Sequence, residues 1–379
     1  MINKINISGF KCFENEEFDL NKITLLTGGN GVGKSSLIQA ILLSRLAIEK
    51  KINININSKE SLDYVNFNGL IPLNNGYELN LGTYFDIFRD TKGANKNEIL
   101  IKLDDDTFKF DIPSILENET SVNVFYEFNF KKKITPFWLK NEFYYLNTER
   151  LGPRHSLAFD HTDFIHCGFK GEFTAQVLEI YGANSRFKSA MINDSDDRLL
   201  IKTNYWLDTI FPGVNVRTKK LGPMNAQILI SSNNNKSEMS ATNIGFGISY
   251  SLPIIVSGLI AEKDSILIIE NPEAHLHPKG QSNIGYFLGK VAESGVKILV
   301  ETHSEHFVNG MRRALLSSEN LKPNDASIYF LDGFENGKIK KILIEVEDTG
   351  DLSKFPRDFF DQVNQDYSEM FKFKINKNG

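Results

Sequence analysis

The stretch Ile23–Ser36, which reads ITLLTGGNGVGKSS, constrains the fold more than any other part of the chain. The apolar run over residues 22–26 predicts a buried strand. It breaks into Gly28–Ser35, which matches G-x-x-x-x-G-K-[ST] at every fixed position, and an amphipathic helical pattern carrying Leu37 and Ile41 follows at once. Strand, glycine loop and helix in this order are the context in which the motif forms a phosphate-binding loop.

Each residue type in this loop has a physical role. Glycines let backbone N–H groups turn inward toward phosphates, and the start of the helix adds a partial positive charge. Lys34 is expected to reach the β- and γ-phosphates of a nucleotide, and the Ser35 hydroxyl is expected to hold Mg²⁺. A plain glycine turn before a helix is the weaker interpretation, because Lys-Ser stands at the required spacing. The residues predicted to contact nucleotide are Asn30, Gly31, Val32, Gly33, Lys34, Ser35 and Ser36.

Composition places the chain among soluble globular proteins. Its 379 residues are 41% hydrophobic and 24% charged, and no apolar run reaches the ~20 residues that a membrane span needs. The N-terminus lacks a signal-peptide hydrophobic region, and Cys12 and Cys167 are the only cysteines, so we expect a cytoplasmic protein with no membrane contact. The net charge of −5 argues against a generally basic nucleic-acid binder. DNA or RNA contact would need a local patch such as residues 131–133 or 217–220, although short basic runs of this kind are usually solvated surface.

The order of the predicted elements indicates an α/β P-loop NTPase, with a mostly parallel core sheet, an antiparallel β subdomain and an inserted helical lobe. We expect a single domain over 1–379, in which 1–51 and 240–335 form the nucleotide-binding core and 52–239 an inserted β/helical lobe. Residues 336–379 are expected to add a C-terminal strand and a cap helix. Predicted strands lie within 3–20 and at 99–103, 122–128, 214–231, 265–269, 297–300, 327–331 and 338–346, and predicted helices at 171–181, 198–211, 280–292 and 306–316. The last helix, marked by Phe359, Val363, Tyr367 and Met370, is expected to cover the core.

A second half of the nucleotide site is predicted near residue 270. The run Ser265–Ile269 is a buried strand that ends in Glu270, as a Walker B strand does, and the carboxylate of Glu270 is the expected Mg²⁺-side acid. Asn271 and Glu273 follow it directly. A neighbouring strand ends at His303, in the position where parallel α/β sheets bind ligands. An H-x-H metal site at residues 275–277 is a weaker alternative, because the segment lies just after a Walker B strand.

Four sequence blocks resemble one group of proteins. They are INISGFKCF before GGNGVGKSS, then NIGFGISYSLP, ENPEAHLHP and ETHSEHF. Together they resemble the ABC-type ATPases of the RecF, SMC and overcoming-lysogenization-defect (OLD) group. The resemblance is strongest to stand-alone bacterial ATPases that have ENPE where most relatives have DEPE, and it spans residues 2 to about 310.

The resemblance implies a head-to-tail homodimer that traps two ATP molecules, with higher oligomers also open. Asn243–Ser249 would be the signature loop that contacts the γ-phosphate of ATP on the other subunit, through Gly245, Gly247 and Ser249, the last of which is expected to open a helix. His303 matches the switch histidine of the family. Arg150 and Arg154 follow an aromatic strand and either reach phosphate or the partner subunit or pack as surface arginines.

One position departs from the pattern of the family. Most relatives have Asp-Glu at the end of Walker B, and the Glu polarises the attacking water, whereas this chain has Glu270-Asn271. An amide can orient water but cannot accept its proton. Either Glu273 or His303 therefore carries more of this work, or hydrolysis is slow.

These observations favour a cytosolic, Mg²⁺-dependent ATPase whose ATP-driven dimerisation controls a DNA-processing or antiphage-defence effector. Because only about 70 residues follow His303 and they hold no suitable acidic cluster, a nuclease or toxin activity would belong to a separate partner protein. The alternatives are an ATP-dependent clamp that hardly hydrolyses ATP and, with less support, the ATPase subunit of a transporter.

Overall fold

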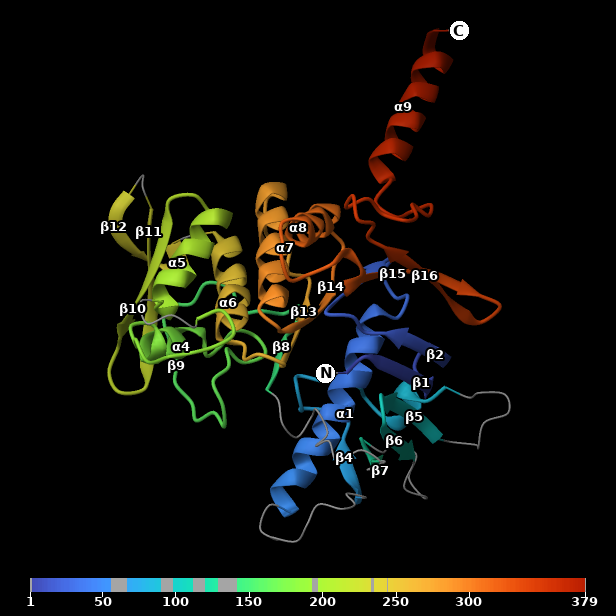
Figure 1. Ribbon diagram of the computed structural model, residues 1–379, viewed down its shortest axis with the longest axis horizontal. Helices are drawn as coiled ribbons and strands as arrows, with labels where there is room; N and C mark the ends of the chain where they lie inside the picture. The colour runs from blue at the N-terminus through green and yellow to red at the C-terminus, as the bar shows by residue number, and fades with distance from the viewer. Residues whose placement is uncertain are drawn as a thin grey trace.

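The computed structural model describes residues 2–55, 67–89, 98–111, 120–128, 142–192, 197–232, 235–243 and 245–378. Three sheets organise this part of the chain, with the core sheet between an antiparallel sheet on one side and a helical lobe on the other (Figure 1). The predicted 131–133 basic run and Ile244 of the signature segment lie outside the described residues.

The core sheet has six strands in the order β16-β15-β3-β14-β13-β8. All neighbouring pairs are parallel except β15 and β16, so the predicted mostly parallel sheet is confirmed. β14 lies between the P-loop strand β3 and the Walker B strand β13. The strands are β3 (Ile23–Gly28), β8 (Phe143–Leu146), β13 (Ile266–Glu270), β14 (Lys297–Glu301), β15 (Ala326–Glu335) and β16 (Lys338–Glu345).

Alternate residues of the core strands face two separate hydrophobic clusters. Leu25 and Ile269 face one cluster with the helices of the lobe, whereas Leu26 and Ile268 face the other with the P-loop helix α1 (Lys34–Asn55). Strands that are buried on both faces read as continuous apolar runs, which explains why these segments were recognisable in the sequence.

The second sheet is antiparallel, with the order β2-β1-β5-β6-β7-β4. It joins the N-terminal hairpin to strands from the long segment after α1, and it lies beside α1 at the lower right of Figure 1. Its strands are β1 (Lys4–Phe10), β2 (Phe13–Asp19), β4 (Phe67–Pro72), β5 (Glu98–Leu103), β6 (Asp106–Asp111) and β7 (Ser121–Phe128), and the short helix α2 (Tyr84–Ile87) follows β4.

The helical lobe packs on the opposite face of the core sheet around a small antiparallel sheet. Its helices are α4 (Thr174–Tyr181), α5 (Leu199–Ile210) and α6 (Phe246–Ile260), and its strands are β9 (Leu157–Ala158), β10 (Val214–Lys220), β11 (Asn225–Ser232) and β12 (Asn235–Ser240), with the 3₁₀ turn η1 (Ala241–Asn243) before α6. The basic run at 217–220 lies on β10, where Arg217 forms an ion pair with Glu238 of β12.

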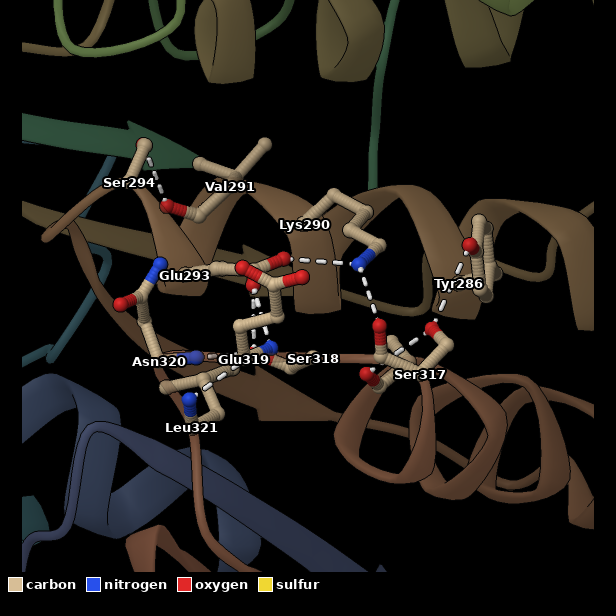
Figure 2. A network of polar contacts seen from close by, with 11 residues as sticks. Tyr286, Lys290, Val291, Glu293, Ser294, Ser317, Ser318, Glu319, Asn320 and Leu321 are labelled. Carbon is tan, nitrogen blue, oxygen red and sulfur yellow. Dashed lines mark hydrogen bonds and ion pairs between the residues drawn. The ribbon is translucent and has the colours of Figure 1, made fainter.

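Helices α7 (Pro278–Glu293) and α8 (Glu305–Leu316) form a tightly packed pair above the sheet. A Cβ at Gly310 would lie 1.9 Å from the carbonyl oxygen of Ser282, so glycine is required for this approach. The ends of the two helices are also joined, because the Glu293 carboxylate of α7 accepts a hydrogen bond from Ser318 (2.6 Å), which follows α8. Glu293 also accepts a hydrogen bond from Lys290 of its own helix (2.7 Å), as Figure 2 shows. The 3₁₀ turn η2 (Pro323–Asp325) then leads to β15.

The C-terminal helix α9 (Gln362–Asn378) differs from the expected cap. It projects from the body of the molecule (Figure 1), and Val363, Tyr367 and Met370 are exposed, at 63%, 66% and 53%. Of the four residues that marked the predicted helix, only Phe359 is buried in the core, and it precedes α9. An amphipathic pattern predicts that a face will be covered but not by which surface, so the assignment to this core was wrong.

None of the helices in the described ranges is both long and apolar enough to cross a lipid bilayer.

Candidate nucleotide-binding site

The P-loop lies at the carboxyl end of β3 and leads directly into α1. Gly28 and Gly33 have φ angles of +128° and +104°, and a Cβ at these positions would lie 2.2 Å from the Leu331 carbonyl oxygen and 2.6 Å from Cys12 Sγ. Asn30 and Gly31 at the tip of the loop are exposed, whereas Val32 and Ser36 are half-buried. The loop therefore has the open, glycine-dependent shape of an anion cradle at a helix N-terminus.

Lys34 is folded back into the loop. Its amino group donates to the carbonyl oxygens of Gly28 (3.1 Å) and Gly29 (2.5 Å), and only 3% of its surface is exposed. Burial lowers the pKa of Lys34, and the nearby carboxylate of Glu301 partly offsets this effect. The cation is thus held at the mouth of the cradle by the backbone of the loop.

Ser35 contacts a carboxylate that the sequence motifs did not assign. Its hydroxyl donates to Glu301 Oε2 at 2.9 Å, and Glu301 Oε1 lies 3.9 Å from the amino group of Lys34. Glu301 ends β14, which pairs with β3 directly. Burial together with the charge of Glu270 raises the pKa of Glu301 to about 7.

Glu270 pairs with Glu301 across β13 and β14, but its carboxylate is held from the other side. It accepts hydrogen bonds from the Tyr145 hydroxyl and from the Thr148 hydroxyl, both at 2.9 Å. Burial raises the pKa of Glu270, and these two hydrogen bonds oppose that rise. The two carboxylates thus lie side by side at the ends of adjacent strands, with Glu301 on the P-loop side.

Arg150 supports the turn after the Walker B strand. Its Nη1 donates to the carbonyl oxygens of Asn147 (2.8 Å) and Glu270 (2.7 Å), and its Nη2 donates to that of Asn271 (2.7 Å). The guanidinium also lies over the ring of Tyr250 in α6, 5.4 Å from its centre. It is therefore a buried structural residue, and burial lowers its pKa to about 10.

Asn271 is held in an unusual position. Its φ angle is +46°, and its backbone N–H donates to the Glu301 carbonyl oxygen at 2.8 Å. The side-chain oxygen of Asn271 is buried without a hydrogen-bond partner among the described residues, as is Nε of Arg150. A buried polar atom of this kind calls for a partner such as an ordered water molecule.

Glu273 connects the turn after β13 to Thr302 and His303, which follow β14. One carboxylate oxygen accepts from the Thr302 hydroxyl (2.8 Å) and the other from the backbone N–H of His303 (2.6 Å). Both oxygens are thus engaged, which favours a positioning role over that of a general base. His303 is exposed, and partial burial and the charge of Lys34 lower its pKa.

The remaining predicted site residues lie around the start of α6. This helix begins at Phe246 with Gly245 as its N-cap, so Ser249 does not open the helix but lies one turn inside it. Gly245 is exposed, and a Cβ added there would have no other atom within 4 Å, whereas a Cβ at Gly247 would lie 2.8 Å from the His275 carbonyl oxygen. Of Gly245, Gly247 and Ser249, only Gly245 is exposed.

Arg154 is exposed and lines a small cavity of about 30 Å³, whose lining also includes Ser249.

The H-x-H alternative is not supported by the structure. His277 is the N-cap of α7, and the ring of His275 packs edge-on against Tyr250, 4.6 Å between centres. Within the described ranges, no group of three or more His, Cys, Asp and Glu side chains is arranged to hold a metal ion alone.

Sequence reasoning missed Glu301, Tyr145 and Thr148 as members of the site. Glu301 does stand at the end of an apolar strand run, as Glu270 does, so a signal was present. Tyr145 and Thr148 offered none, because only the pairing of β8 with β13 brings them to Glu270.

The residues present fit a nucleotide with Mg²⁺. The loop can take this shape only with glycine at positions 28 and 33, where a Cβ would collide with the Leu331 carbonyl oxygen or with Cys12. A serine hydroxyl beside paired carboxylates is the hard oxygen donor set that Mg²⁺ prefers. When bound, Mg²⁺ neutralises phosphate charge, and Lys34 would supply the cation on the other side.

A family model described as "AAA ATPase domain" matches residues 1–164 and 182–308, which is most of the chain. A second, described as "Protein of unknown function (DUF3696)", matches residues 321–370. No curated protein matches the sequence.

Solved structures with a similar fold include heads of SMC proteins. One is an Smc head domain with an extended coiled coil bound to the C-terminal domain of ScpA, derived from Pyrococcus furiosus, with 11% identity, coverage of 92% of this chain and 97% of that chain, and a TM-score of 0.51. An SmcHead bound to the C-winged helix domain of ScpA has 12% identity, coverage of 92% and 98% and a TM-score of 0.48. The SMC head domain from Thermotoga maritima has 12% identity, coverage of 91% and 99% and a TM-score of 0.42. At these identities the likeness concerns the fold alone.

Proposed function

This chain belongs to the AAA ATPase domain family, and from that premise we propose that it is an ATP-hydrolysing switch whose two copies close around ATP and control a separate effector protein. It is an ATP-binding ATPase with an α/β P-loop fold like that of an SMC head. We infer that the whole chain forms one ATPase domain, since strands from its beginning, middle and end share one sheet.

The observation that carries the proposal is the arrangement at the carboxyl ends of β3, β14 and β13. There Lys34 and Ser35 lie beside the carboxylates of Glu301 and Glu270, and the unpartnered amide oxygen of Asn271 lies at the turn that follows. This set supplies a phosphate cradle, Mg²⁺ ligands and a group able to orient water. In the proposed reaction, His303 senses the γ-phosphate from the end of the neighbouring strand.

The exposed start of α6 supports the dimer part of the proposal. Gly245 leaves the N-terminus of a 15-residue helix open, and Phe246 beside it is 54% exposed. A helix N-terminus favours an anion such as the γ-phosphate on a second subunit. The effector would be a nuclease or toxin, with DNA or RNA as a further partner.

A second candidate function is an ATP-dependent clamp with very slow turnover. It is favoured by Asn271, because an amide in place of the usual carboxylate orients water without accepting its proton. ATP hydrolysis and ATP-induced dimerisation, measured on the same preparation, separate the two candidates.

The test uses Gly245→Asp, which adds a negative side chain where the structure has open space. We expect the variant to fold and bind ATP as the wild type does but to stay monomeric with a non-hydrolysable ATP analogue, as measured by light scattering after size exclusion. The matched control is Ile201→Asp on α5, at a position that is 58% exposed. Dimerisation of Gly245→Asp at the wild-type ATP concentration would contradict the proposed interface, and a wild type that does not bind ATP would contradict the function itself.

A further inference from the structure

Glu301 is the carboxylate that touches the P-loop serine. The Ser35 hydroxyl donates to it at 2.9 Å, and the Lys34 amino group lies 3.9 Å away. Its side chain is only 8% exposed, and that of Lys34 is 3% exposed. Burying a carboxylate costs free energy unless it is paired and hydrogen-bonded, and buried acids of this kind cluster at functional sites.

The order of the strands explains why this contact is made by Glu301 and not by Glu270. β14 lies between β3 and β13, so a residue at its end is one strand nearer the P-loop. The carboxylate of Glu270 is held by Tyr145 and Thr148, which come from β8 and the loop after it on the far side. The carboxylate of Glu270 is thus oriented by Tyr145 of β8 and by Thr148, whereas the carboxylate beside Ser35 is that of Glu301 in β14.

The contact between Ser35 and Glu301 affects how a phosphate group can bind in the cradle. The groups needed by a phosphate are engaged within the chain, since Lys34 donates to Gly28 and Gly29 and Ser35 donates to Glu301. A carboxylate at this place repels an approaching phosphate, whereas a divalent cation between the two attracts both. Serine hydroxyl and carboxylate oxygens are ligands that Mg²⁺ accepts.

We propose that Glu301 is the Mg²⁺-side carboxylate next to Ser35 and that it makes nucleotide binding depend on Mg²⁺. This inference rests on the proposed ATPase function. With Mg²⁺ present, Glu301 and Ser35 would help to hold the cation, which would offset the charge of Glu301. Without Mg²⁺, the charge of Glu301 opposes the nucleotide, so free ATP binds weakly.

The experiment measures the affinity of a fluorescent ATP analogue in Mg²⁺ and in EDTA for the full chain. Wild type should bind more tightly in Mg²⁺, and the ratio of the two affinities is the Mg²⁺ coupling. Glu301→Gln should bind more tightly than wild type in EDTA, and its coupling should fall by about tenfold or more, which is within the usual range for coupled sites. Mn²⁺ binding to the nucleotide-loaded protein, measured by electron paramagnetic resonance, should weaken in parallel.

The matched control is Glu293→Gln, a half-buried acid at the end of α7 whose partners are Lys290 and Ser318. It should keep the wild-type coupling. If it lost coupling as fully as Glu301→Gln, the effect would be one of general buried charge and the proposal would be overturned. Should Glu301→Gln fail to fold, Glu301→Asp serves, because it withdraws the carboxylate by one methylene and should also reduce the coupling.

Unchanged coupling in a folded Glu301 variant overturns the inference while leaving the ATPase function intact. A wild type that binds no nucleotide in either buffer instead refutes the proposed function. The two failures are therefore distinguishable in one set of titrations.

Discussion

Arg150 donates a 2.7 Å hydrogen bond from Nη2 to the carbonyl oxygen of Asn271, and this bond connects the buried arginine to the residue that directly follows Glu270. The same guanidinium holds the carbonyl oxygen of Glu270 and lies over Tyr250 of α6. Arg150 therefore links the Walker B turn to the helix whose start is the proposed signature contact. It is a positioning residue for both.

The first prediction concerns this arginine. Arg150→Ala should lower the free energy of unfolding by about 3–5 kcal/mol, because it leaves carbonyl oxygens at a buried turn without their charged donor. Chemical denaturation measures the change. Arg154→Ala, at an exposed position four residues later, should change stability by less than about 0.5 kcal/mol. Equal effects of the two substitutions would show that the buried hydrogen bonds contribute little.

The second prediction concerns Lys34. Lys34→Ala removes the cation that faces the phosphates, so ATP affinity should fall by about 30-fold or more, given the usual cost of 2–5 kcal/mol for losing a buried charge partner. Equilibrium titration with an ATP analogue measures this. Lys22→Ala, whose side chain is 44% exposed, is the control and should bind normally. An affinity for Lys34→Ala within about threefold of wild type would refute the P-loop assignment.

The third prediction concerns His303. His303→Ala should leave ATP binding largely intact and reduce turnover by about 10²-fold, as expected when a group that stabilises developing charge is lost. His306→Ala, an exposed histidine in the first turn of α8, is the matched control. Unchanged turnover at saturating ATP would make His303 structural.

Glu273 extends this test, because its carboxylate holds the backbone of His303. Glu273→Gln should also lower turnover, and the double variant with His303→Ala should be no slower than His303→Ala alone. Fully additive losses would instead indicate an independent chemical role for Glu273.

The fourth prediction concerns Asn271. If the missing carboxylate limits water activation, Asn271→Glu should raise turnover, because it restores a base one residue after Glu270. General-base catalysis is worth about 10²–10⁴-fold, and the gain should be smaller where other groups already assist. Asn271→Asp, with a carboxylate one methylene shorter, is the control for reach. Steady-state turnover with no gain in either variant would place water activation elsewhere.

The fifth prediction concerns Lys297, a buried lysine at the start of β14 whose amino group donates to the carbonyl oxygens of Ile2 and Leu20. Burial lowers its pKa to about 8, and Asp104 only partly offsets this. The unfolded chain then binds more protons than the folded protein between pH 8 and about 10.5, so this group favours folding increasingly as the pH rises through that window.

The measurement is the free energy of unfolding of wild type minus that of Lys297→Met, which should increase by about 2 kcal/mol between pH 7.5 and pH 9.5. A difference for Lys297→Met that stays flat or falls would contradict the lowered pKa.

The P-loop, the strand that carries Glu270 and the strand that leads to His303 were predictable from the sequence, because each is a contiguous pattern with its own local chemistry. The confirmed α/β fold followed from the alternation of these strands with helices. Contiguous patterns do not state the order of strands in a sheet, however. That order places β14 beside β3, so that Glu301 meets Ser35, and brings Tyr145 of β8 to Glu270.

The burial of Arg150 and the exposure of α9 also depend on the tertiary structure. Arg150 turns inward because the Walker B turn presents carbonyl oxygens that need a donor, which no local pattern near residue 150 reveals. The apolar face of α9 is visible in the sequence, but a helix buries that face only where the fold offers a complementary surface, and the described core offers it none. Local chemistry is written in neighbouring residues, whereas these contacts depend on which distant segments the folded chain brings together.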